Sequence, residues 1–294
     1  MLGKLITGMT HNREVRIYVA DTTKMVEAAR ATHDLSPIST AALGRTLTAA
    51  VMMGMMSKID KEKVTLQIKG SGDIKLMIAI ADTHGHVKAY TSNPHAETRT
   101  NELGKLAVGE SVGTDGKVIL IRDYGMKEPF IGQSDLVSGE IAEDLAHYFG
   151  QSEQQPTAVG LGVFLSPEAT VKSAGGFIVQ ILPETQGETI DQLEANLSGM
   201  KSITQLFEDG LTVEQIAGQV LAGLGLDELE TYPLEYVCDC SREKMKIGMM
   251  SIGKTALQEI LDEDGQAELI CHFCNNKYLF EENELIDLLN QMEK

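Results

Sequence analysis

The chain has 294 residues, of which 43% are hydrophobic, and this indicates one large domain and a smaller one. Its formal net charge of −18 lies mostly in the last third, where an anionic surface disfavours nucleic-acid binding. The start, MLGKLITGMT, lacks a secretion signal, and the most apolar stretch, 40–56, contains Arg45 and is shorter than a span of about 20 residues. We therefore expect a soluble cytoplasmic protein that binds no membrane, with a buried helix at 40–56.

Residues 1–183 alternate short strand patterns with isolated helix patterns. The stretch 63–90 is typical of an antiparallel meander, with GSGD and THGH as its turns. The other patterned segments are strands at 15–20, 116–125, 157–166 and 174–183, and helices at 21–35 and 138–156. Because strands cluster without a regular βαβ alternation, we predict an N-terminal α+β domain with an antiparallel sheet.

Residues 184–230 form a distinct acidic segment with a net charge of −9. Apolar residues recur near helical spacing, but glycines such as Gly199, Gly210 and Gly218 interrupt them. Each interior glycine weakens a helix by about 1 kcal/mol relative to alanine. We predict a linker of short, marginal helices that need a partner surface. Two interpretations remain open, a moving part and a static helical layer that closes the core.

The chain's four cysteines lie in two close pairs near its end, in VCDCSREK and ICHFCNNK. Cys238 and Cys240 form a Cys-x-Cys pair, and Cys271 and Cys274 form a Cys-x-x-Cys pair. Two such pairs can complete the tetrahedral sphere of a Zn²⁺ ion, a metal that takes thiolates where Ca²⁺ and Mg²⁺ prefer oxygen. With four thiolates available, His272 is predicted to lie outside this sphere, on the solvated rim.

The tail, residues 231–294, has few large apolar side chains and a net charge of −7. A segment of this size rarely obtains more than about 3–5 kcal/mol from its own core. A structural zinc site contributes about 10–16 kcal/mol of apparent binding free energy, which is coupled to folding. We therefore predict a small zinc-binding domain that is folded with the metal and unfolded without it.

Thiolates bind metal and are also attacked by oxidants, so the same pairs suit a redox switch. Two pairs can hold zinc when reduced and become two disulfides when oxidised, and the sequence has no other thiol to compete. The simpler interpretation is a zinc ribbon that never changes state, bound to a nucleic acid or a protein partner. The tail's negative charge argues against the nucleic acid.

Two further motifs suggest other functions. GMMSIGKT at 248–255 fits the phosphate-binding loop pattern, in which Lys254 would contact phosphate and Thr255 would hold Mg²⁺. Such a loop should follow a buried strand, whereas SREKMKI before it is charged, so we interpret the match as chance. His84 and His86 flank a glycine turn, which predicts an exposed hairpin tip or, less readily, a two-histidine metal site. No nucleophile–base set is visible, so we predict no enzyme activity.

The sequence also resembles the heat shock protein 33 family, the redox-regulated chaperones of the bacterial cytosol. The motifs that carry the resemblance are KGSGDIKL (69–76), YFGQSEQQPT (148–157), AGGFIVQILP (174–183), CDCSRE (238–243) and LDEDGQAELICHFCNNKYLF (261–280). Together they extend over essentially the whole chain. The double-cysteine signature is the most specific of them.

The resemblance implies a switchable chaperone that works without ATP. In its reduced form, Cys238, Cys240, Cys271 and Cys274 hold one Zn²⁺ and the protein is a poor chaperone. Oxidation joins Cys238 to Cys240 and Cys271 to Cys274, releases the zinc and unfolds the tail and the linker. The exposed apolar surface then binds unfolding client proteins, and the active form is a homodimer.

Overall fold

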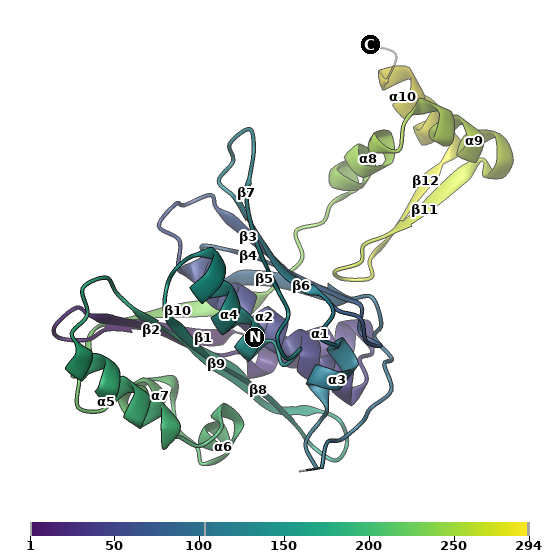
Figure 1. Cartoon of the computed structure of the whole chain (residues 1–294). Helices are drawn as coiled ribbons and strands as arrows, with labels where there is room; N and C mark the ends of the chain where they lie inside the picture. Colours follow the sequence, from purple (N-terminus) through teal and green to yellow (C-terminus); the bar gives the residue numbers. More distant parts are fainter. Residues whose placement is uncertain (1, 103, 293–294) are drawn as a thin grey trace. The chain divides into compact units, whose positions relative to one another are not determined.

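The computed structural model describes residues 2–102 and 104–292. The chain divides into two compact units, one that ends at Val237 and one that begins at Cys238 (Figure 1). The first unit is α+β, as predicted. The predicted boundary at 230/231 falls inside a strand of the sheet, so the division between compact units lies further along the chain.

One large sheet organises the first unit. In the described part of the chain ten strands form it, in the spatial order β7 (Phe130–Asp135), β6 (Lys117–Asp123), β3 (Lys63–Lys69), β4 (Leu76–Asp82), β5 (His86–Thr91), β10 (Asp227–Tyr236), β1 (Gly3–Met9), β2 (Val15–Asp21), β9 (Val171–Ile181) and β8 (Thr157–Leu165). Neighbours pair antiparallel, as predicted, except β5 and β10, which pair in parallel. The sheet is therefore mixed.

The first face of the sheet is covered by α1 (Thr23–His33), α2 (Pro37–Met55), α3 (Val108–Val112) and α4 (Ala142–Ser152). The helix α2 lies at the centre of this core and is buried along nearly its whole length. Its single charge, Arg45, pairs with Glu140 at 2.5 Å. The predicted buried helix at 40–56 is therefore confirmed. No helix among the described residues is both long enough and apolar enough to cross a membrane.

Three short helices cover part of the opposite face, α5 (Gly187–Ser198), α6 (Ile203–Glu208) and α7 (Val213–Val220) (Figure 1). They pack on strands β1, β2 and β9. Successive side chains of these strands point to opposite faces of the sheet, so each strand contributes to the cores on both faces. In β1, Leu5 belongs to the first core and Ile6 to the second. We call α5, α6 and α7 the helical layer. It occupies the predicted linker and is docked, with Ile216 and Val220 fully buried.

The second unit is small. It contains α8 (Arg242–Ser251), α9 (Lys254–Asp264), the hairpin β11 (Gln266–Ile270) and β12 (Lys277–Glu281), and α10 (Glu282–Gln291). Its buried apolar side chains are Met249, Leu257, Phe280, Leu285, Leu288 and Leu289. So few side chains make a weak core for a unit of this size, as the sequence predicts.

Candidate metal centre

The four cysteines meet at one point of the second unit. Cys238 and Cys240 lie in the extended segment that precedes α8, and Cys271 and Cys274 lie in the turn between β11 and β12. That turn is closed by backbone hydrogen bonds from the Cys271 N–H to Asn276 and from the Asn275 N–H to Cys271. Asn275 takes a positive φ of 59°, a conformation that asparagine tolerates better than most residues. The turn therefore presents both thiols on one side.

The sulfur geometry fits a tetrahedral ion. All four Sγ atoms lie within 4.8 Å of one another, and all four thiols are free. The Cys238 and Cys271 sulfurs are 3.7 Å apart, and those of Cys240 and Cys274 are 3.3 Å apart. A tetrahedron with metal–sulfur bonds of about 2.3 Å has sulfur–sulfur edges of about 3.8 Å. These four residues can therefore hold a metal ion.

The electrostatics of the cluster favour a cation at its centre. Burial raises the pKa values of Cys238 and Cys274, the latter to about 11. Burial also acts to raise the pKa of Cys240, but hydrogen bonds from Tyr278 and from the neighbouring thiols outweigh it and lower that pKa to about 7. Cys240 therefore ionises before Cys238 and Cys274. The others would place further negative charge beside it, which a bound cation would neutralise.

Two side chains that the sequence analysis did not single out support the cluster. The Tyr278 hydroxyl lies 3.1 Å from the Cys240 sulfur, and this contact raises the pKa of Tyr278 to about 12. Arg242 pairs with Glu284 at 2.6 Å, donates to the Leu279 carbonyl, and lies 4.4 Å from the centre of the Phe280 ring. These contacts hold the chain just after Cys240 against β12 and α10.

We expect replacement of Tyr278 by Phe to weaken metal binding. The substitution keeps the ring and removes the hydroxyl that donates to the Cys240 thiolate. Loss of such a supporting partner typically lowers metal affinity by about 10- to 100-fold. Competition with a chromogenic chelator, under reducing conditions, measures the change. Tyr124→Phe, in the first unit, is the matched control, and an unchanged affinity in Tyr278→Phe would show that the hydroxyl does not stabilise the ligand set.

The other candidate residues do not join a site. His272 is exposed and lies outside the four-thiol cluster. His84 and His86 are near separate carboxylates, Asp60 at 3.7 Å and Asp82 at 2.9 Å. Within residues 2–102 and 104–292, the four cysteines are the one group of three or more close histidine, cysteine or carboxylate ligands.

The phosphate-loop motif has the wrong context for nucleotide binding. Gly248 lies inside helix α8, and Lys254 and Thr255 begin helix α9. A phosphate-binding loop instead joins a buried strand to a helix. Residues 248–255 therefore form a helix–turn–helix connection, which agrees with the interpretation of the motif as a chance match.

Comparisons with known proteins agree with this architecture. The family model described as Hsp33 protein matches residues 3–281. A protein of Alkaliphilus metalliredigens named 33 kDa chaperonin is 44% identical over 292 residues, which cover 99% of this chain and 100% of that protein. A Bacillus subtilis protein of the same name is 44% identical over 287 residues, which cover 98% of each chain.

A solved structure matches as well. The crystal structure of the 33 kDa chaperonin (heat shock protein 33 homolog) from Thermotoga maritima superposes with a TM-score of 0.90 at 36% identity, and the match covers 99% of each chain. The fold, the thiol cluster and these relatives define a chaperone. The chain belongs to the Hsp33 family.

Proposed function

We propose that this protein is a redox-regulated chaperone that holds unfolding proteins without ATP in the cytoplasm. The observation that carries the proposal is the convergence of all four cysteines of the chain, as free thiols within 4.8 Å, in a unit with a small apolar core. Such a unit depends on its ligand set for stability. Any reaction that consumes the thiolates would therefore remove the metal ligands and destabilise the second unit.

In the reduced state we assign one Zn²⁺ to Cys238, Cys240, Cys271 and Cys274. Four sulfur donors at tetrahedral spacing favour zinc over Ca²⁺ or Mg²⁺, which take oxygen ligands. The bound ion would neutralise the thiolates and hold the segment before α8 against the β11–β12 turn. This form is the inactive one, because the helical layer still covers the sheet.

Oxidation by a peroxide converts the ligands into disulfides. A thiolate attacks the peroxide, becomes a sulfenic acid and releases water after proton uptake, and a second thiol then displaces another water to form the S–S bond. Two peroxides are consumed for two disulfides. We assign these to Cys238–Cys240 and Cys271–Cys274, since each of these disulfides closes a short loop and survives unfolding of the unit. In the folded cluster the closest sulfurs belong to different pairs, Cys238 with Cys271 and Cys240 with Cys274.

Loss of the second unit would then release the helical layer. Its helices have 12, 6 and 8 residues, and isolated helices shorter than about 12–15 residues are marginal in water. Their departure would uncover Ile6, Val15, Ile17, Val19 and Val179, which are all fully buried beneath the layer. This apolar sheet face is the proposed client surface, and the oxidised protein is proposed to act as a homodimer.

A paired assay on the purified, zinc-loaded protein tests the proposal. Peroxide is added at mild heat, zinc release is followed with a chromogenic chelator, and aggregation of an unrelated unfolding protein is followed by light scattering. We expect zinc release and suppression of aggregation to rise together and to be reversed by a thiol reductant. Zinc that stays bound, or that leaves without any gain in holding activity, would show that the cysteines serve a static ribbon.

A further inference from the structure

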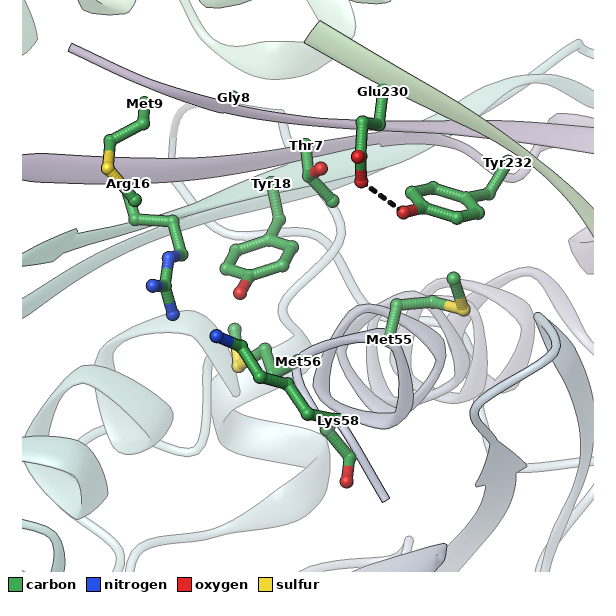
Figure 2. Close-up of a pocket in the computed structure, with 11 residues that line it drawn as sticks. Thr7, Gly8, Met9, Arg16, Tyr18, Met55, Met56, Lys58, Glu230 and Tyr232 are labelled. Atoms are coloured by element: carbon green, nitrogen blue, oxygen red, sulfur yellow. Dashed lines mark hydrogen bonds between the residues drawn. The ribbon is translucent and has the colours of Figure 1, made fainter. Parts of the chain in front are cut away.

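A second, chemically distinct site lies in the first unit. A pocket of about 280 Å³ opens between the end of α2 and the sheet strands β2, β1 and β10 (Figure 2). The strand register brings Tyr18 of β2 beside Thr7 of β1, and Thr7 beside Glu230 of β10. Lys58 joins them from the segment that follows α2. The pocket is therefore assembled from four separate parts of the sequence.

Two cations face this pocket without a carboxylate partner. The Arg16 guanidinium and the Lys58 ammonium point toward one another in Figure 2, and among the described residues neither forms an ion pair. The one acidic side chain of the lining, Glu230, accepts a hydrogen bond from Tyr232 at the other end. In a chain with a net charge of −18, two unneutralised cations at one small pocket are unexpected. They create a local site for an anion.

Tyr18 adds a fixed hydroxyl beside these charges. Its side chain is 4% exposed, and its hydroxyl lies at the wall of the pocket near Arg16 and Lys58 (Figure 2). Burial raises the pKa of Tyr18, and the charge and hydrogen bond of Arg16 oppose that rise only in part. The hydroxyl is therefore protonated at neutral pH, and it can donate a hydrogen bond to an anion. Because Tyr18 is held by the sheet, this donor is pre-positioned.

The lining also has an apolar part. Met55 and Met56, at the end of α2, and Met9 of β1 border the same pocket. Methionine side chains are flexible and polarisable, so they adapt to small apolar groups of varied shape. A ligand for this pocket would therefore combine a compact anionic head with a short apolar part. The volume is slightly below the usual range for small-molecule sites, about 300–1,000 Å³, so the ligand must be small.

We propose that this pocket binds a small phosphate monoester. The planar guanidinium of Arg16 suits two phosphate oxygens, the ammonium of Lys58 supplies a second charge, and the Tyr18 hydroxyl donates to a third oxygen. A dianion with three terminal oxygens matches two cations and three donors better than a carboxylate does. The organic group of the ester would lie against Met55 and Met56.

The test uses the full-length, reduced, zinc-loaded protein and three probes, namely inorganic phosphate, propyl phosphate and butyrate. Titration calorimetry at low ionic strength measures each affinity. We expect saturable binding of propyl phosphate at one site, tighter than that of inorganic phosphate, and no saturable binding of butyrate. Lys58→Met and Arg16→Met should each lower the affinity for propyl phosphate at least tenfold. Lys61→Met, an exposed lysine outside the pocket lining, should leave it unchanged.

Three outcomes would overturn the proposal. They are the absence of saturable phosphate binding, an affinity that survives Lys58→Met, and butyrate binding as tight as that of propyl phosphate. Lys58 is exposed, so its substitution keeps the fold even if Arg16→Met does not. Equal thermal unfolding of Lys58→Met and the parent protein, without ligand, confirms that a lost affinity reports the site.

Discussion

Removal of the metal from the reduced protein should unfold residues 238–294 and release the helical layer, while the sheet of the first unit and α2 stay folded. The second unit has a small buried core, whereas a structural zinc ion contributes about 10–16 kcal/mol of apparent binding free energy. Without that contribution the unfolded form should be populated at room temperature. Hydrogen exchange followed by mass spectrometry, before and after chelation, measures the effect. We expect protection of α8, α9 and α10 to vanish and protection of β3, β4 and α2 to persist.

Matched substitutions separate a metal effect from a chelator effect. Cys271→Ser removes one buried ligand and should reproduce the unfolding without any chelator. His272→Ala changes the adjacent, exposed residue and should leave protection and metal content unchanged. A second unit that keeps its protection after complete metal removal would contradict the proposed dependence on zinc, and the small core would then have to suffice for folding.

The two candidate ligand pairs were predictable from sequence because each pair is encoded locally. Cys238 and Cys240 must lie close together, as must Cys271 and Cys274, whatever the rest of the chain does. The supporting side chains were not predictable in the same way. Tyr278 contacts Cys240 across 38 residues of sequence, and Arg242 contacts Glu284 across 42 residues through the packing of α8 on α10. The spacing of these residues in the sequence does not determine either contact.

The strand β10 shows a second limit of sequence patterns. Its residues, DELETYPLEY, are rich in acids and contain Pro233, features that disfavour a central strand. It nevertheless lies between β1 and β5, with Leu234 fully buried. Pairing with strands from the beginning of the chain outweighs the local preference. The sequence analysis therefore placed the end of the linker at residue 230, inside this strand. The pocket near Lys58 was not predicted either, because its walls come from segments that are distant in the sequence.

Undocking the helical layer should activate the reduced protein without any oxidant. Ile216 is fully buried in α7 and packs with the apolar side chains of the sheet face. Ile216→Glu would place a charge there with no partner, and an uncompensated buried charge costs about 3–5 kcal/mol. Because short helices have little stability of their own, undocking the layer should cost less free energy than burying the charge, and the layer should leave the sheet. The zinc-loaded variant should then suppress aggregation of an unfolding protein in light-scattering assays.

The control lies on the same helix. Gln219→Glu adds the same charge at an exposed position of α7 and should leave the layer docked and the reduced protein inactive. Hydrogen exchange across residues 187–220 reports docking, and chelator titration confirms that both variants retain zinc. If Ile216→Glu loses protection there but holds no client, the apolar sheet face is not the client surface. If it holds clients with zinc still bound, the metal centre acts only by controlling access to that face, and the binding surface belongs wholly to the first unit.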